Sequence, residues 1–273
     1  MTTPNTSNRK EMPFVQHLLE LRDRLLKIIL AVAVILLILM PFANDLFTIL
    51  AEPLLHLMPE NTQMIAIEVA SPFFTPFKLT LVLSIFLAMP IILYHLWAFV
   101  APGLYQHEKS MILPLLASST ALFYLGMLFA YAVVFPLIFG FMISMTPEGV
   151  EMMTDISRYL DFVLKLLFAF GVAFQVPIAT ILLVRMDIVS PEALANKRPH
   201  IIVGAFVVGM LMTPPDMISQ TLLAIPIWLL FEVGLFLARR TSHRKKTKED
   251  YPAVITPEEP KHEIKQIEED KKK

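Results

Sequence analysis

Six long runs of apolar residues, separated by shorter polar stretches, organise the chain. They cover residues 25–43, 77–97, 111–136, 159–184, 200–212 and 218–238. A bilayer core about 30 Å thick needs roughly 20 apolar residues in α-helical form, and all the runs except 200–212 come close to that length. We expect flanking residues to extend the short run, or the bilayer to be thinner beside it. The pattern predicts an all-α membrane protein with six transmembrane helices.

The charges between the runs indicate on which side of the membrane each loop lies. Lys and Arg are frequent before residue 25, in the loop after residue 184 and beyond residue 238, whereas loops 44–76 and 140–157 contain none. Because cytoplasmic loops carry an excess of Lys and Arg, this alternation predicts that both termini are cytoplasmic.

The same patterns divide the chain into regions. Residues 1–24 form a cytoplasmic N-terminal segment, and residues 25–238 form the six-helix transmembrane domain. Residues 239–273 are charged and poor in apolar side chains, which is typical of a disordered tail.

The outer loop 44–76 is long, and we expect it to be structured. Asn44 and Asp45 are suited to begin a helix. A helix lying on the outer membrane surface is predicted by the apolar positions that follow on one face: Leu46, Ile49, Leu50, Leu54 and Leu57.

Proline is frequent and glycine is rare, with 21 prolines and 8 glycines. The prolines within or at the edges of the apolar runs are Pro41, Pro90, Pro114, Pro136, Pro177 and Pro226. Each lacks a backbone donor and tends to kink its helix. We therefore predict kinked helices arranged as a concave, glove-like bundle.

Composition supports the membrane assignment and narrows the function. The chain of 273 residues is 56% hydrophobic and 17% charged, with mean hydropathy +0.63, whereas a soluble domain is about 45–50% apolar and about 25% charged. A net charge of −1 gives no basic excess for a nucleic-acid partner. The absence of cysteine excludes a disulfide framework, thiolate zinc sites and a cysteine nucleophile.

Enzyme motifs are absent from the sequence. It contains no H-E-x-x-H zinc motif, no G-x-S-x-G nucleophile elbow and no G-x-x-x-x-G-K-[ST] phosphate loop. We expect no catalytic residue, no metal site and no cofactor.

Polar residues inside the apolar runs are candidates for function because they are costly in a bilayer. Gln175 lies near the midpoint of run 159–184, so it needs a partner on a neighbouring helix or in a water-filled recess. Gln220 lies nearer the outer end of its run. Lys165 and Glu232 can reach the membrane surface, and Glu232 can alternatively pair with Arg239.

Two acids lie on the side of the membrane where positive charge predominates. Glu20 precedes the first run and can form an i, i+4 pair with Arg24, worth about 0.3–0.5 kcal/mol if exposed. Glu108 precedes the third run, where an acid suits a helix N-terminus. Neither acid by itself defines a site.

Five segments, in chain order, carry a resemblance to a known family: HLLELRDR at 17–24, VASPFFTP at 69–76, WAFVAPGLYQHE at 97–108, FYLG at 123–126 and GAFVVGMLMTPPD at 204–216. On these segments the sequence resembles TatC, the multi-spanning subunit of the twin-arginine protein translocase. The resemblance extends from residue 13 to about residue 238. It implies six helices, cytoplasmic termini and a concave glove shape.

The resemblance also implies a binding site. The family binds signal peptides with paired arginines on its cytoplasmic face, through acids that correspond to Glu20 and Glu108. Arg22, Phe99 and Tyr105 accompany them. Each arginine offers a planar fork that can engage a carboxylate through two hydrogen bonds. Two such contacts fall short of micromolar affinity, so we expect the apolar part of the signal peptide also to pack in the membrane.

Three further positions follow from the resemblance. Family members commonly have glutamate where this chain has Gln175; glutamine does not titrate, so contact with a partner helix is the role that remains for it, as for Gln220. Pro53 and Asp216 match family positions in the outer loops.

The resemblance implies the partners and the location. They are TatA- and TatB-type single-span subunits, twin-arginine signal peptides of folded precursors, other copies of the chain and the lipid bilayer. The location is the bacterial cytoplasmic (inner) membrane, with transport driven by the proton gradient. The alternative is a six-span secondary transporter of a small solute, for which mid-membrane charge and internal symmetry would be expected.

Overall fold

The computed structural model describes residues 8–57, 64–100, 112–147, 153–186, 188–212 and 217–249. Within these ranges the chain is helical apart from short connections and one isolated β-bridge between Ile65 and Asp155. In chain order the elements are α1 (Asn8–Leu39), η1 (Met40–Phe42), α2 (Ala43–Leu57), α3 (Ser71–Leu87), α4 (Met89–Val100), α5 (Ile112–Phe129), the π-helical turn η4 (Ala130–Val134), α6 (Phe135–Ser144), α7 (Ile156–Ala173), α8 (Val176–Arg185), α9 (Pro191–Asn196), α10 (Arg198–Met212) and α11 (Met217–Glu249). The all-α fold class is confirmed.

Every predicted apolar run is helical in the described ranges. Four helical segments are long and apolar enough to cross a membrane: Leu18–Glu52, Leu113–Ser144, Ile156–Arg185 and Met217–Arg240. Helices α3 and α4 pass the same test together but are bent by 48°. Helix α10 is apolar and shorter, at 15 residues. The six-span count and the cytoplasmic location of both termini stay predictions.

Interruptions of the helices coincide with most of the prolines in the apolar runs. Pro41 lies in the 3-10 turn between α1 and α2, and Pro90 follows the bend between α3 and α4. The π-helical turn η4 precedes Pro136, and the break between α7 and α8 precedes Pro177. A proline removes an i→i−4 hydrogen bond and crowds the preceding turn, which accounts for these four kinks.

The other two prolines leave their helices uninterrupted. Pro114 lies in the first turn of α5, where no intrahelical donor is required. Pro226 lies inside α11, which continues through it.

The end of the last helix differs from the sequence expectation of a disordered tail from residue 239. Helix α11 continues to Glu249. Arg, Lys and Glu are good helix formers, so the charged residues after the apolar run prolong the helix. Residues 250–273 lie outside the described ranges. The short helix α9 between α8 and α10 was also not expected; Ser190 caps it by accepting a hydrogen bond from the Ala193 backbone at 3.1 Å.

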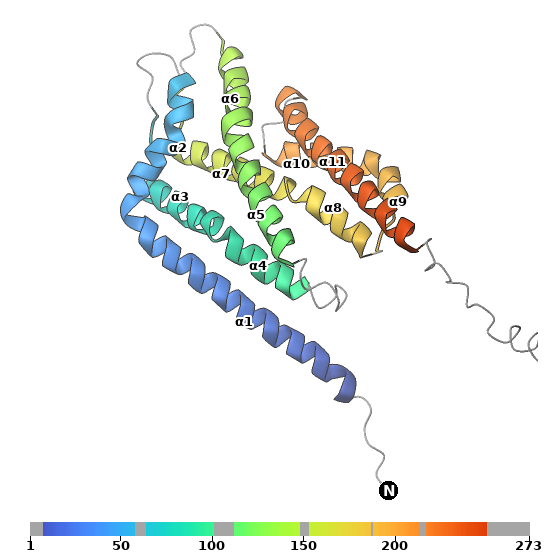
Figure 1. Ribbon diagram of the computed structural model, residues 1–273. Coiled ribbons are helices and arrows are strands. Elements are labelled where there is room, and N and C mark those ends of the chain that lie inside the picture. Colours follow the sequence, from blue (N-terminus) through green and yellow to red (C-terminus); the bar gives the residue numbers. More distant parts are fainter. Residues whose placement is uncertain are drawn as a thin grey trace, which may run out of the picture.

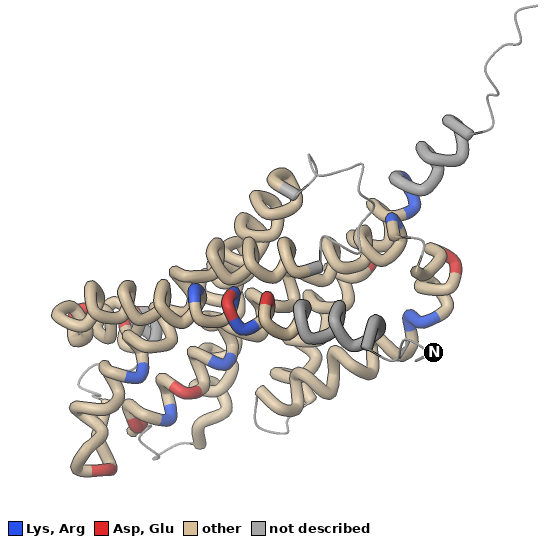
Figure 2. The backbone as a smooth tube through the Cα atoms, turned by 90° about the horizontal axis from the view of Figure 1, so that it is seen from below, with Lys and Arg blue, Asp and Glu red and all other residues tan. Residues whose placement is uncertain are grey.

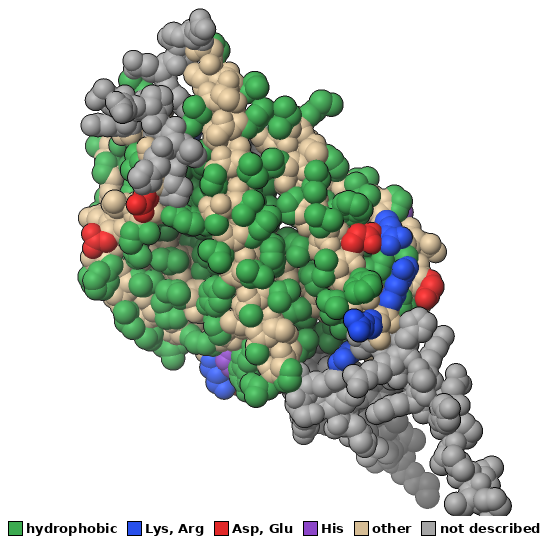
Figure 3. Space-filling view, turned by 45° about the horizontal axis from the view of Figure 1, so that its top comes forward, with side chains coloured by type: hydrophobic (Ala, Val, Ile, Leu, Met, Phe, Trp, Pro, Cys, Tyr) green, Lys and Arg blue, Asp and Glu red, His purple; other side chains and the backbone are tan. Residues whose placement is uncertain are grey.

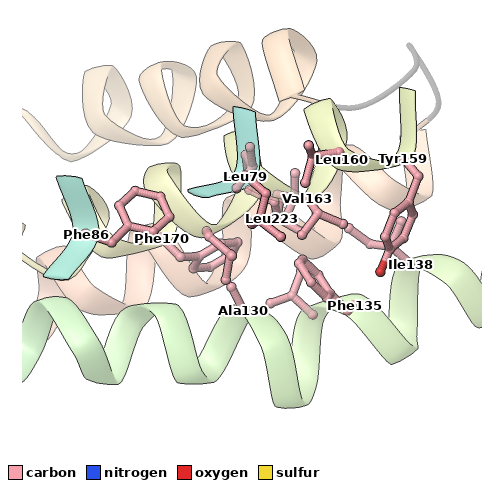
Figure 4. Packing of buried hydrophobic residues seen from close by; sticks show 14 of the residues in the cluster. Leu79, Phe86, Ala130, Phe135, Ile138, Tyr159, Leu160, Val163, Phe170 and Leu223 are labelled. Atoms are coloured by element: carbon pink, nitrogen blue, oxygen red, sulfur yellow. The ribbon is translucent and has the colours of Figure 1, made fainter. Parts of the chain in front are cut away.

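Two groups of helices pack around α5 and α7 (Figure 1). Helix α1 packs along α3 and α4, while α11 packs along α8 and α10. Helices α5 and α7 contact each other and join the groups. Figure 4 shows the resulting core, where Phe86, Phe135 and Phe170 come from different helices and are each almost fully buried.

Two glycines permit close approach of one helix to the backbone of another. A Cβ atom at Gly126 in α5 would lie 2.5 Å from the backbone oxygen of Phe170 in α7. A Cβ atom at Gly234 in α11 would lie 2.7 Å from Cα of Pro177 in α8. Both distances are too short for a real contact, so any larger residue would force the helices apart.

The surface of the bundle is largely apolar. Figure 3 shows hydrophobic side chains over most of one face, with charged side chains near its margins. From Leu18 to Ile38, helix α1 exposes many apolar side chains, including Leu30 at 66% and Leu37 at 74%. So large an exposed apolar surface is typical of a helix bundle embedded in a bilayer.

Candidate functional site

The N-terminal half of α1 is tied to the end of α4 by one arginine. Arg24 Nε and Nη2 both donate to Glu20 Oε1, at 3.0 and 2.5 Å. Arg24 Nη2 also donates to the backbone oxygen of Ala98, at 3.3 Å. The pair is partly shielded, with 21% of the Arg24 side chain and 40% of the Glu20 side chain exposed. The i, i+4 pair predicted from the sequence is thus present.

Arg24 thus lies between Glu20 and the end of α4, where Phe99 directly follows Ala98 in the chain. We call the group Glu20, Arg24, Ala98 and Phe99 the α1–α4 corner. Beyond residue 17, the charged positions of α1 lie on a short stretch that is followed by a long stretch without any, as Figure 2 shows. A partly exposed carboxylate beside the end of an apolar helix suits a cationic ligand with an apolar neighbour.

Arg22 does not join this corner. Its Nε and Nη2 donate to Asp23 Oδ1 at 2.9 and 2.7 Å, and 64% of its side chain is exposed. Two residues along an α-helix turn by about 200°, so Arg22 faces away from the side that Glu20 presents to α4.

Other predicted site residues lie outside the described ranges. They are Tyr105, Glu108 and Asp216. The structure therefore places Glu20 at the α1–α4 corner, and the contributions of Phe99, Tyr105 and Glu108 stay predictions. Pro53 belongs to the backbone of α2.

The side-chain amide of Gln175 forms hydrogen bonds with the neighbouring helix α5. Its Nε2 donates to the backbone oxygen of Ser119 at 2.9 Å, and Ser119 Oγ donates to its Oε1 at 2.5 Å. Gln175 directly precedes α8, at the break before Pro177. The first of the two possibilities drawn from the sequence, hydrogen bonding between helices, is confirmed.

Gln220 joins α11 to α10. Its Nε2 donates to the backbone oxygen of Phe206 at 3.0 Å. A Cβ atom at Gly209 would lie 3.2 Å from the Gln220 backbone oxygen, so this glycine lets the two helices approach. An apolar hollow lies nearby between the same helices, lined by Ile202, Phe206, Ala224, Ile225 and Trp228.

Glu232 is paired, but with Arg198 rather than Arg239. Arg198 Nε and Nη2 donate to Glu232 Oε1 and Oε2, at 2.6 and 2.8 Å. This two-bond pair connects the start of α10 to α11. Sequence inspection missed it because the partners are 34 residues apart and only the return of α11 alongside α10 brings them together.

Pro53 leaves one backbone oxygen of α2 without its usual donor within the helix. In a helix, the oxygen of Ile49 would accept a hydrogen bond from the backbone N–H of residue 53, which proline lacks. Tyr131 supplies a donor instead, with its hydroxyl 3.3 Å from the Ile49 oxygen. The Tyr159 hydroxyl donates to the next oxygen, that of Leu50, at 2.8 Å. The two tyrosines fasten α2 to η4 and α7.

Further polar contacts hold the segment after α2 against α7. The backbone N–H groups of Ile65 and Ile156 donate to the oxygens of Thr154 and Ile65, at 3.0 and 2.9 Å. Ser157 Oγ lies 2.9 Å from Thr75 Oγ1 and donates to Ser71 Oγ at 2.8 Å. The described residues of segment 44–76 thus form helices and polar contacts, and α2 packs against α3 and α6.

Comparison with known proteins identifies close relatives. A family model for the Sec-independent protein translocase protein TatC matches residues 16–226. The Sec-independent protein translocase protein TatC of Azotobacter chroococcum mcd 1 is 58% identical over 244 residues, which is 89% of this chain and 96% of that protein. The corresponding protein of Escherichia coli K12 is 58% identical over 227 residues, covering 83% of this chain and 88% of that protein.

A solved structure has the same fold. The crystal structure of a twin-arginine translocase receptor, TatC, aligns with a TM-score of 0.75 at 40% identity. The alignment covers 83% of this chain and 99% of that chain.

Proposed function

The chain belongs to the TatC family of Sec-independent protein translocase proteins, and from this premise we propose that it binds twin-arginine signal peptides at the α1–α4 corner. Membership of this family supports protein translocation over the alternative of a small-solute transporter. The observation that supports the proposal is the partly exposed Glu20 carboxylate, which already accepts two hydrogen bonds from a guanidinium group.

The chemistry of the corner suits an arginine of the signal peptide. Glu20 is partly exposed, so an incoming guanidinium can approach it from outside the bundle. Arg24 limits the orientations of the carboxylate and thereby lowers the entropy lost on binding. Glu108 supplies the second carboxylate for the second arginine, and Arg22, Phe99 and Tyr105 complete the site.

The free energy of the two arginine contacts alone is too small for micromolar binding, so a further contribution is required. Hydrogen bonds to charged groups are worth about 1.5–3 kcal/mol each, whereas a micromolar dissociation constant corresponds to about 8 kcal/mol. The apolar part of the signal peptide supplies the difference by packing on the exposed apolar side chains beside the corner. Leu25 of α1 and Leu96 of α4 are such side chains, 53% and 50% exposed.

The wider assignment follows the family. The chain resides in the bacterial cytoplasmic membrane with both termini inside, and it performs no covalent chemistry. It assembles with TatA- and TatB-type single-span subunits and with other copies of itself, and the proton gradient drives transport. Gln175 and Gln220 are contact positions for partner helices, while Pro53 and Asp216 act on the outer side.

Photocrosslinking of a twin-arginine precursor to the protein in membranes tests the site. We compare the wild type with Glu20→Ala and Glu108→Ala, and use Glu192→Ala as the control because it removes an exposed acid of α9 outside the proposed site. Each site variant should weaken crosslinking about tenfold or more, as the loss of one charge-assisted contact implies, whereas Glu192→Ala should not. Wild-type crosslinking by Glu20→Ala would refute the carboxylate site.

Replacing the two signal-peptide arginines by lysines tests the geometry of recognition. Lysine keeps the charge but lacks the planar fork, so the lysine-pair precursor should crosslink more weakly. Equal crosslinking would mean that charge alone is recognised.

A further inference from the structure

A row of charged residues lies on one face of α7, within a helix long enough to span the membrane. Arg158, Asp161 and Lys165 are three and four residues apart, a spacing that places side chains on the same helix face. Helix α7 forms the first part of the apolar segment Ile156–Arg185. At about 1.5 Å per residue, Arg158 and Lys165 are roughly 10 Å apart along the axis.

A cation from a second helix joins this row. Lys78 Nζ of α3 forms an ion pair with Asp161 Oδ1, although the two residues are 83 positions apart in the sequence. The group therefore contains Lys78, Arg158, Lys165 and Asp161, and its formal charge is +2. We call it the α3–α7 charge row.

The row is on the surface of the bundle. The side chains of Lys78 and Asp161 are 53% and 43% exposed, and Arg158 and Lys165 are exposed as well. Within the described residues, Arg158 and Lys165 form no ion pair. Asp161 is partly exposed, so it does not need Lys78 to compensate for loss of hydration on burial. Arg158 and Lys165 are two further cations beside this pair.

The location of these cations runs against the charge distribution of the rest of the chain. Residues 140–157, which precede α7, and residues 44–76, which precede Lys78, contain no Lys or Arg. By the predicted topology this end of α7 is the outer one, where an excess of Lys and Arg is unusual. Charged side chains at a lipid-facing surface need a partner that the bilayer itself or another protein provides.

We propose that the α3–α7 charge row binds the phosphate of an anionic phospholipid in the outer leaflet. Lys and Arg snorkel toward the headgroup region along their aliphatic stems, and a row about 10 Å long with net positive charge suits one or two phosphates. Apolar side chains flank the row, such as Phe168 at 50% exposure, and lie where acyl chains would pack. A lipid is favoured over an acidic partner helix because the row projects from a surface that is otherwise apolar.

Lipid retention by the purified full-length protein, measured by native mass spectrometry, tests the proposal. The probes are phosphatidylglycerol and phosphatidylcholine with identical acyl chains. We compare the wild type with Arg158→Gln and Lys165→Gln, and use Lys197→Gln as the control because it removes an exposed cation far along the chain from the row. Each row variant should lower phosphatidylglycerol retention about fivefold, while phosphatidylcholine retention and the Lys197 control should stay near wild type.

Asp161→Asn should change phosphatidylglycerol retention in the opposite direction. It releases Lys78 and raises the charge of the row, so phosphatidylglycerol retention should increase. Millimolar inorganic phosphate should not displace the lipid, because free phosphate lacks the acyl chains. Unchanged retention in Arg158→Gln and Lys165→Gln, or a decrease in Asp161→Asn, would overturn the proposal. Loss of a crosslink to a partner protein in these variants, with lipid retention unchanged, would assign the row to that partner instead.

Discussion

Arg24 makes three hydrogen bonds, two to Glu20 within α1 and one to the Ala98 oxygen of α4, and its effect on binding can be separated from that of Glu20. Replacing Arg24 by Gln keeps the Glu20 carboxylate but removes the guanidinium that links it to the Ala98 oxygen. We expect twin-arginine peptide affinity to fall about fivefold, because Glu20 then adopts more orientations and more entropy is lost on binding. Titration of a fluorescent signal peptide in detergent measures this affinity.

Lys27→Gln is the control for Arg24→Gln, since Lys27 is an exposed cation one turn further along α1. It should leave the affinity near wild type. A higher affinity of Arg24→Gln would mean that Arg24 competes with the signal peptide instead of positioning Glu20.

Tyr159 is a second residue whose contribution to stability can be measured by itself. The residue is 2% exposed, and its hydroxyl donates a hydrogen bond to the Leu50 backbone oxygen. Tyr159→Phe removes this bond without changing the ring, so the free energy of unfolding should fall by about 1 kcal/mol. Thermal unfolding in detergent measures the change, with Tyr94→Phe as the control because Tyr94 is 49% exposed. Equal stability of Tyr159→Phe and the wild type would contradict a fastening role for this hydroxyl.

At the level of helices, the contact between α5 and α7 depends on Gly126. A methyl group there would meet the Phe170 oxygen at 2.5 Å, and a backbone atom cannot move aside as a side chain can. Gly126→Ala should therefore destabilise the protein by about 1–3 kcal/mol, measured by unfolding in detergent.

Gly140 provides the matched control for Gly126. It also lies in a helix, α6, but a Cβ atom added there meets nothing within 4 Å. Since alanine favours a helix over glycine by about 0.5–1 kcal/mol, Gly140→Ala should be neutral or stabilising. Equal destabilisation by both substitutions would show that helix contact is not the cause.

The sequence predicts a feature of the helices well when nearby residues cause that feature. The apolar runs and the kinks near Pro41, Pro90, Pro136 and Pro177 follow from composition and from the missing proline N–H, and both can be recognised along the chain. The extension of α11 to Glu249 was missed because charged composition fits a helix as well as a disordered tail.

Pairs between helices were the hardest to predict. The i, i+4 contact of Glu20 with Arg24 is local and was predicted. The pairs Arg198–Glu232 and Lys78–Asp161 join residues 34 and 83 positions apart. They depend on which helices become neighbours, and hydrophobic periodicity does not encode that. Gln175 needed a partner by chemistry, but only the packing of α8 near α5 identifies Ser119.

For the whole molecule, the absence of cysteine makes the six-span topology directly measurable. The natural chain has no background thiol, so single substitutions such as Thr2→Cys, Asn61→Cys, Glu148→Cys and Thr213→Cys report one position each. A membrane-impermeant maleimide added to spheroplasts should label residues 61, 148 and 213 but not residue 2. Labelling after lysis is the control for reactivity. Protection of residue 213 would mean that α10 does not cross the membrane.

The short length of α10 has a consequence for biogenesis. With 15 residues, α10 extends about 22 Å, which is less than the roughly 30 Å thickness of the hydrocarbon core. By itself it therefore moves poorly from the insertion machinery into the bilayer. Its hydrogen bond from Gln220 and its close approach to α11 at Gly209 are available only when α11 has been synthesised. Helix α10 therefore enters the bilayer as a hairpin with α11, and in a chain truncated after residue 216 the Thr213→Cys substitution should no longer be labelled from the outer side.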